Sequence, residues 1–129
     1  MKKGRLILTD INKINKLENC EKWFIARMPM ESMQEYDITW RYELAPSHDL
    51  FTWYLGNRHK DGWFKEYIPQ YLEQLKTDNS AKGILNLLCY KLNNNQNVAL
   101  ICYCKNSQCH GSIIGKILRK KGYDVERLK

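Results

Sequence analysis

The sequence predicts an α/β fold, a single small domain over residues 1–129 whose mostly parallel sheet of four to five strands is flanked by helices. Two observations predict it. Short apolar runs with strand character alternate with longer segments whose apolar residues recur at helical spacing, which is typical of parallel sheets. A chain of 129 residues is also one domain by size and can bury a core without disulfides.

The first part of the chain contains two predicted strands. Residues 5–9 are apolar enough for a buried strand, and residues 12–17 predict a short polar connection or helix. Residues 22–28 are the second predicted strand, which Pro29 ends. Residues 30–44 are irregular and rich in aromatic side chains, so we expect a long ordered excursion over the sheet.

Three helices are predicted next. Ser47 is a good N-cap for the first helix, and residues 57–62 break it. Residues 64–75 carry an apolar stripe at helical spacing, and Pro69 lies inside it, so we expect a kink or a restart there. One of residues 79–80 is expected to cap the third helix.

The last third of the chain contains the strongest strand signal. A polar turn at residues 93–95 ends the third helix, and residues 98–103 form a continuous apolar strand. A terminal helix is predicted up to about Lys121, with Gly122 just beyond its end. Residues 123–128 alternate as a strand does.

Chemically reactive side chains cluster between this strand and the terminal helix. The strand ends in Cys102 and Cys104, and Cys109 and His110 open the helix. Ligands of open α/β sheets bind at the carboxyl ends of the strands. We therefore expect the functional site at this edge.

One interpretation of the cluster is a thiol nucleophile. Cys109 is predicted at a helix N-terminus, where backbone N–H groups and the helix dipole lower the pKa of a thiol, and Cys104 faces the same loop. His110 would act as a base or orient the nucleophile. A phosphatase-type loop requires Arg six positions after its Cys, but Cys102 has Gln108 there and Cys104 has His110. The sequence therefore does not favour phosphatase chemistry.

A second interpretation is an anion site at the start of the terminal helix. Backbone N–H groups of the loop could face a phosphate, and basic side chains would neutralise its charge. For Arg27, the alternative is a structural ion pair with Asp37 or Glu35. The predicted ligand-binding residues are Arg27, Ser47, Lys105, Ser107, Gly111 and Ser112.

Two further interpretations stay open. Three thiols and an imidazole are ligands that zinc favours, but their spacing is tighter than in structural zinc sites, and we expect no metal and no cofactor. Packing alone is the expected role of Cys20 and Cys89, because Cys is often buried as a small hydrophobe. Trp40, Trp53 and Trp63 could stack a base, but we expect them to cover the sheet.

The formal net charge of +7 favours an anionic partner. The 21 basic residues are scattered apart from a local concentration at residues 116–129, so a functional anion surface and simple solubility both stay open. The expected partner is an anionic small molecule such as a nucleotide, and nucleic acid is not favoured. No apolar run is long enough to span a membrane, so we expect no membrane partner. The short apolar start is interrupted at Asp10 and Asn12, and no small-residue cleavage site follows, so we expect no signal peptide. Five cysteines without a disulfide framework favour a reducing cytoplasm. The sequence predicts no particular oligomeric state.

Four segments follow one another in a recognisable order. They are a strand ending in Arg27 before Pro29, Leu-Ala-Pro-Ser at residues 44–47 before an aromatic helix, a second aromatic helix beginning at residues 63–67, and the cysteine segment at residues 102–110. In this order they resemble the family known as domain of unknown function 488, especially its YeaO-like branch. The resemblance implies an α/β sheet with the site at its carboxyl edge and implies no established activity.

Taken together, these patterns predict a small cytoplasmic α/β protein that binds a phosphate-bearing ligand at the cysteine-rich edge of the sheet. A nucleotide is the expected class of ligand. One alternative is a thiol-dependent enzyme with Cys104 or Cys109 as nucleophile, assisted by His110. Another is a phage protein that blocks a host factor, because the Asn- and Lys-rich composition is typical of low-GC bacteria and their phages.

Overall fold

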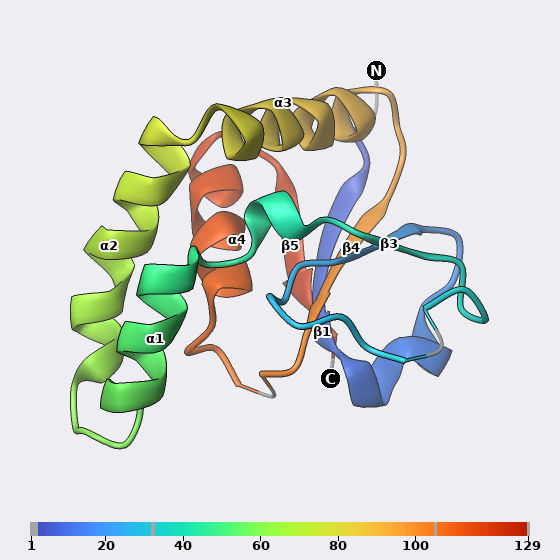
Figure 1. Cartoon of the computed structure of the whole chain (residues 1–129). Helices are drawn as coiled ribbons and strands as arrows, with labels where there is room; N and C mark the ends of the chain where they lie inside the picture. Colours follow the sequence, from blue (N-terminus) through green and yellow to red (C-terminus); the bar gives the residue numbers. More distant parts are fainter. Residues whose placement is uncertain (1–2, 32, 105, 129) are drawn as a thin grey trace.

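Five parallel strands form the centre of the molecule in the computed structural model, which describes residues 3–31, 33–104 and 106–128 (Figure 1). The strands are β1 (Arg5–Asp10), β2 (Glu21–Phe24), β3 (Ile38–Trp40), β4 (Val98–Cys102) and β5 (Asp124–Arg127). Their order across the sheet is β3-β2-β4-β1-β5, and neighbouring strands run parallel. The predicted α/β fold is confirmed, and the described strands form a wholly parallel sheet.

The strand β4 occupies the middle of the sheet. Leu100 lies in register between Leu8 of β1 and Trp23 of β2. All residues of β4 are buried, because neighbouring strands cover both its edges and other elements cover both faces of the sheet. A strand buried in this way consists of a continuous apolar run, which explains the strong signal at residues 98–102.

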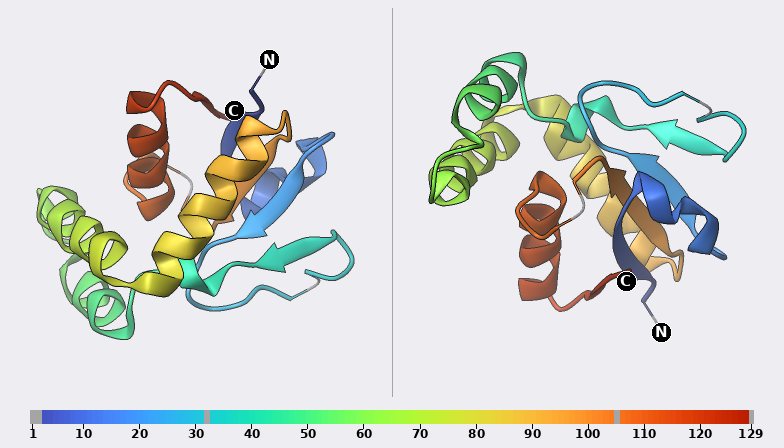
Figure 2. Two further views of the ribbon diagram at one scale, coloured as in Figure 1. Left: turned by 90° about the horizontal axis from the view of Figure 1, so that it is seen from above. Right: turned by 90° about the horizontal axis from the view of Figure 1, so that it is seen from below.

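The connections contain two 3-10 helices, η1 (Ile11–Lys16) and η2 (Tyr42–Leu44), and the helices α1 (His48–Asn57), α2 (Trp63–Thr77), α3 (Asn79–Asn93) and α4 (His110–Lys120). Figure 2 shows α3 and α4 over one face of the sheet and η1 over the other. The helices α1 and α2 form an antiparallel hairpin beside α4 (Figure 1), and α2 contacts both α3 and α4. In the described part of the chain, no helix combines the length and the apolar character needed to cross a membrane.

Side-chain caps begin two of the four α-helices in the described part of the chain. The hydroxyl of Ser47 accepts a hydrogen bond from the backbone N–H of Leu50 at 3.2 Å, which confirms the predicted N-cap of α1. The N-cap of α3 is Asp78, and not Asn79 or Ser80 as predicted. Its carboxylate accepts from the backbone N–H of Ser80 at 2.9 Å, and a carboxylate is as good an N-cap as the Asn or Ser side chain.

The predictions for the ends and interruptions of helices had mixed outcomes. The helix α2 runs through Pro69 without a restart. Proline removes only the N–H that would bond to the carbonyl of Lys65, and Lys65 is exposed, so water can take its place. Gly122 follows α4 as predicted, with a φ of +93°, the left-handed conformation that commonly ends helices.

Two strand predictions require correction. The second strand ends at Phe24 and not at residue 28. The backbone N–H of Ile25 still donates to the carbonyl of Ile101 at 2.9 Å, and the chain then turns away from the sheet. The stretch at residues 30–44 is not wholly irregular, because it contains β3 and η2. Three residues that pair with a single neighbour are too few to give a periodic signal.

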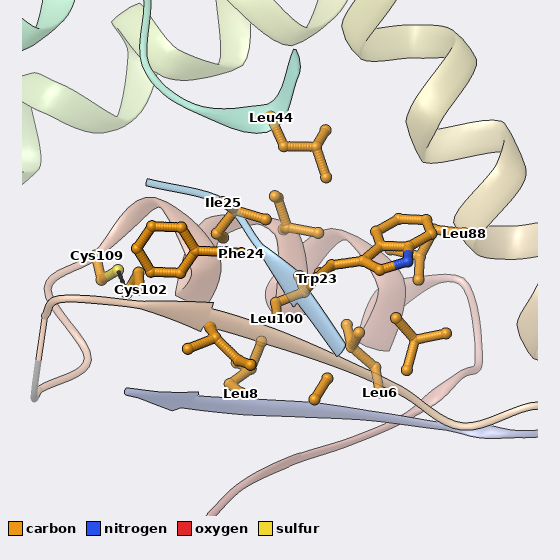
Figure 3. Packing of buried hydrophobic residues seen from close by; sticks show 14 of the residues in the cluster. Leu6, Leu8, Trp23, Phe24, Ile25, Leu44, Leu88, Leu100, Cys102 and Cys109 are labelled. Atoms are coloured by element: carbon orange, nitrogen blue, oxygen red, sulfur yellow. Dashed lines mark hydrogen bonds between the residues drawn. The ribbon is translucent and has the colours of Figure 1, made fainter. Parts of the chain in front are cut away.

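The core lies between the sheet and the helices α3 and α4 (Figure 3). Trp23 and Leu100 are buried there with Leu88 of α3 and Leu44 of η2. The guanidinium group of Arg41 lies over the Trp23 ring, 4.5 Å from its centroid, which adds a cation–π contact to the packing. The core therefore holds the central strands in register and fixes the edge at which they end.

Candidate functional site

A cavity of about 220 Å³ opens at the carboxyl edge of the sheet. The segments that follow β2 and β4 form one side of it, and α1 and α2 form the other. The chain leaves β2 toward β3 and leaves β4 toward β5, which lie at opposite ends of the sheet. Open α/β sheets bind ligands at such points of divergence.

An aromatic wall formed by Tyr54, Trp63 and Tyr67 lines the side of the cavity made by α1 and α2. The ring centroids of Tyr54 and Trp63 are 5.2 Å apart, and those of Trp63 and Tyr67 are 5.7 Å apart, with edge-to-face angles. Such pairs fix one another's orientation. The wall therefore offers a stiff surface to a planar ligand.

Two arginines line the same cavity. Arg27 follows β2, and its guanidinium donates to the carbonyl of Pro46 at 3.3 Å. Arg58 at the end of α1 lies over the ring of Tyr54, 5.9 Å from its centroid. Among the described residues, no carboxylate pairs with Arg27 and no Asp or Glu lines the cavity. The alternative ion pair of Arg27 with Asp37 or Glu35 is therefore not formed, and two guanidinium groups line the cavity without a carboxylate partner among the described residues.

Cys102, Cys104 and Cys109 form a three-thiol cluster whose sulfur atoms all lie within 4.8 Å of one another. The sulfur atoms of Cys102 and Cys109 are 2.8 Å apart (Figure 3). Both residues are buried, whereas Cys104 is half-buried. All three line the cavity, so the predicted convergence of the end of β4 with the start of α4 is confirmed.

The cluster concentrates negative charge on Cys104. Hydrogen bonds from Cys102 and Cys109 lower the pKa of Cys104 to about 3, and the nearby charge of Arg127 acts in the same direction. The pKa of Cys102 is raised by its own hydrogen bonds with Cys104 and Cys109 and by burial. For Cys109 the bond with Cys102 lowers the pKa, but its bond to Cys104, burial and the charge on Cys104 outweigh this and raise it to about 12. Of the two predicted nucleophiles, Cys104 is thus the one with thiolate character.

His110 is buried at the start of α4. Its Nε2 lies 2.7 Å from the carbonyl oxygen of Ile25, so Nε2–H is the donor and Nδ1 is left unprotonated. That Nδ1 is 3.8 Å from the sulfur of Cys109, and the ring meets Tyr71 edge to face at 5.5 Å. The pKa of His110 is lowered, because the effect of burial outweighs the opposing effects of the hydrogen bond to the Ile25 carbonyl and of the charge on Cys104. The geometry fits an orienting role, which fixes the start of α4 to the end of β2.

With this arrangement in view, comparison with protein families gives a match over residues 8–122 to a model described as the active DUF488-N3 subclade. The chain belongs to the DUF488-N3a family. The resemblance to domain of unknown function 488 is thereby confirmed, and the matched subclade is N3a. No match to the chain was found among curated proteins or among solved structures.

Sequence reasoning missed several residues of the site in this DUF488-N3a protein. The rings of Tyr54 and Tyr67 belong to helix stripes that usually indicate core, and Arg58 lies where the first helix was expected to be broken. Arg127 of β5 donates to the hydroxyl of Ser112, and its charge acts on Cys104. Only the aromatic content of the two helices could have signalled a binding surface.

The predicted site residues of the DUF488-N3a chain are only partly brought together. Arg27, Cys104, Cys109 and His110 line the cavity. The other residues predicted to bind the ligand and described in the structure lie outside the lining, namely Ser47, Ser107, Gly111 and Ser112. Lys105 is not among the described residues.

The four predicted ligand-binding residues outside the cavity lining have other contacts or positions. Ser47 caps α1, and Ser107 is exposed. Gly111 is buried, and a side chain there would meet Ile25 at 3.4 Å. The hydroxyl of Ser112 accepts from Arg127. A ligand role for these residues stays a prediction.

The remaining predictions concern packing and metal binding. Cys20 and Cys89 are half-buried against the core, as expected of small hydrophobes. Trp40, Trp53 and Trp63 also lie against the core, and Trp63 lines the cavity as well. The three-thiol cluster is, in addition, a set of sulfur donors of the kind that zinc accepts.

Proposed function

We propose that this DUF488-N3a protein is a thiol-dependent enzyme that binds an anionic ligand with a planar ring, by its chemistry a nucleotide, and uses Cys104 as its nucleophile. One observation carries the proposal: the sulfur of Cys104 shares a single cavity with two arginines and an aromatic wall. The description of the matched family model as an active subclade supports an enzyme and names no reaction.

The charges around the cavity support an anionic ligand. Arg27 and Arg58 supply guanidinium groups, which bind phosphate and carboxylate oxygens through paired hydrogen bonds. No Asp or Glu among the described residues lines the cavity, and two guanidinium charges there outnumber the one negative charge of the Cys104 thiolate. The overall charge of +7 would further attract an anion from solution.

The aromatic wall supports a ligand with a planar ring. Tyr54 and Trp63 meet edge to face, and an aromatic face of this kind stacks a base with a contribution of about 1–3 kcal/mol. A cavity of about 220 Å³ suits a small ligand, or the ring and one phosphate of a larger one.

The position of Cys104 supports nucleophilic chemistry. It is the least buried member of the three-thiol cluster, and its neighbours hold its thiolate form. The Cys104 sulfur would form a bond to an electrophilic atom of the ligand, and the leaving group would depart with the bonding electron pair and take a proton from water. Because neither Cys102 nor Cys104 is followed by Arg at the sixth position, phosphatase chemistry is not favoured for this step.

Alkylation of the full chain tests the proposal. The reduced protein is treated with iodoacetamide alone and with nucleoside monophosphates, nucleoside diphosphates or inorganic phosphate, and the modified cysteines are mapped by mass spectrometry. We expect Cys104 to react first and at least one of the nucleotides to protect it. The same nucleotide should raise the melting temperature, because a ligand that binds the folded state stabilises it.

Matched arginine variants make the test specific. Arg58→Ala should weaken the protection of Cys104, whereas Arg119→Ala should not, because Arg119 is exposed on α4 and lies outside the cavity. If inorganic phosphate protects Cys104 as well as nucleotides do, the cavity is an anion site with no preference for a planar ring. The proposal is wrong if Cys104 is no more reactive than Cys20, or if no phosphate compound alters either readout.

A further inference from the structure

The three-thiol cluster contains two more thiols than a single nucleophile requires. All three thiols line the cavity, but Cys104 is half-buried, whereas Cys102 and Cys109 have only 4% and 3% of their surfaces exposed. A single reactive thiol needs neither partner for nucleophilic attack. The two buried thiols therefore call for a role of their own.

We infer that the cluster is a peroxide-sensitive relay, in which Cys104 is oxidised first and a disulfide between Cys102 and Cys109 stores the oxidation. The inference rests on the proposed function in giving Cys104 the reactive role. It goes beyond that function by adding a reversible modification that controls the same site.

The chemistry takes place in three balanced steps. The Cys104 thiolate attacks a peroxide, so that with hydrogen peroxide the O–O bond breaks, Cys104 becomes a sulfenic acid and hydroxide leaves. The Cys109 thiol then displaces the sulfenic oxygen, which leaves as water, and a disulfide joins Cys104 to Cys109. Finally, Cys102 attacks the Cys109 sulfur, and Cys104 leaves as a thiolate. The proton lost by Cys102 neutralises the hydroxide, so two thiols and one hydrogen peroxide give one disulfide and two waters.

The geometry favours Cys102 and Cys109 as the final pair. Their sulfur atoms are 2.8 Å apart and need to approach by less than 1 Å to reach the disulfide bond length of about 2.05 Å. Cys104 is also the best leaving group of the three, because thiols of low pKa leave fastest in disulfide exchange. Cys104 and Cys102, by contrast, are separated by one residue, so a disulfide between them would close a very small ring.

The disulfide would alter the site without occupying Cys104. Cys102 and Cys109 donate the hydrogen bonds that stabilise the Cys104 thiolate. A disulfide has no S–H, so both donors disappear on oxidation, and Cys104 becomes a weaker thiolate. Oxidation would thus reduce the reactivity of Cys104, and reduction of the disulfide would restore it.

Thiol counting on the full chain tests the relay and needs no ligand. The reduced protein has five free thiols. It is given one molar equivalent of hydrogen peroxide, quenched with iodoacetamide and digested with trypsin. We expect two thiols to disappear and all five to return after dithiothreitol. Cleavage after Lys105 separates Cys109 from the other two cysteines, and fragmentation of the linked peptides should place the disulfide on Cys102 and the alkyl group on Cys104.

Variants identify the thiol that reacts first. Cys104→Ser should slow the loss of thiols by at least about tenfold, because a low-pKa accessible thiol is then missing. Cys20→Ser should leave the rate unchanged. The wild-type peptide map stands by itself if a variant does not fold.

Three results would overturn the relay: a final disulfide other than Cys102–Cys109, oxidation of Cys104 to a sulfinic acid without any disulfide, or one equivalent of zinc held by the protein purified without chelator. If nucleotides protect Cys104 but no disulfide forms, the relay fails and the proposed function stands. If the disulfide forms while no phosphate compound protects Cys104, the proposed function fails and the oxidation chemistry remains.

Discussion

The buried His110 makes the stability of the fold depend on pH in a predictable direction. Burial lowers the pKa of His110 in the folded state, against the opposing effects of the Ile25 carbonyl and of Cys104. The groups that face the ring are Tyr71, edge to face, and the sulfur of Cys109 at 3.8 Å from Nδ1. The unfolded chain therefore binds a proton at this imidazole at a higher pH than the folded protein does, so the free energy of unfolding falls as the pH falls.

The size of the effect follows from the two protonation equilibria. The unfolded histidine has a pKa of 6.5, so the loss begins near pH 7 and continues down to the lowered pKa of the folded state. If His110 stays neutral in the folded state throughout, lowering the pH from 7.0 to 5.5 costs about 1.3 kcal/mol of unfolding free energy. Below the folded-state pKa the loss stops, because both states then carry the proton.

Urea unfolding at pH 7.0 and at pH 5.5 measures this difference in the wild type and in His110→Phe. The Phe ring can keep the edge-to-face contact with Tyr71 but does not titrate. The loss of the hydrogen bond from His110 to Ile25 affects the stability equally at both pH values. We expect the variant to be less stable at pH 7.0 and to lose less stability than the wild type between the two pH values, by up to about 1.3 kcal/mol. The exposed His59→Asn serves as the control and should follow the wild type. Identical pH dependence in wild type and His110→Phe would refute the reasoning.

Three further predictions concern stability and can be checked by chemical or thermal unfolding. Leu100→Ala should destabilise the protein by about 2–5 kcal/mol, because Leu100 is buried in the central strand. A smaller loss would mean that neighbouring side chains fill the space left by the missing Leu100 side chain. Ser47→Ala should cost about 1 kcal/mol by removing the hydrogen bond to the N–H of Leu50, whereas Ser47→Asp should retain stability. Gly4→Ala should cost about 1–3 kcal/mol, because its Cβ would lie 1.9 Å from the backbone oxygen of Gln96; wild-type stability would show that this contact is absent in solution.

The fold could be predicted from the sequence wherever burial leaves a periodic record. The strand β4 is a continuous apolar run because it is covered on both faces, and α3 carries an apolar stripe because only one side of it is buried. The strand β3 could not be predicted, because its three residues pair with one neighbour and give no period to detect. The cap of α3 was misassigned to its neighbours because Asp, Asn and Ser satisfy the same backbone N–H groups.

The candidate site was predictable in place but not in composition. The junction of β4 with α4 could be found because reactive residue types crowd there in the sequence. Which thiol carries the charge depends on which sulfur is buried behind the others, and that is decided by three-dimensional contacts. The aromatic wall escaped prediction because Tyr54 and Tyr67 follow the helical periodicity of core residues, and a helix facing a cavity has the same period as one facing a core.

The central position of β4 has a consequence for how the chain acquires its structure during synthesis. The strands β1 and β2 come first from the ribosome, yet they do not pair with each other, because β4 lies between them. In a nascent chain that ends at Asn97, β1 has no neighbouring strand with which to pair, because both of its neighbours, β4 and β5, follow later. The apolar residues of β1 therefore stay uncovered. Such late, long-range pairing slows folding and leaves apolar segments exposed, and therefore prone to aggregation, until the sheet forms. Translation must therefore continue past Cys102 before the central part of the sheet can assemble.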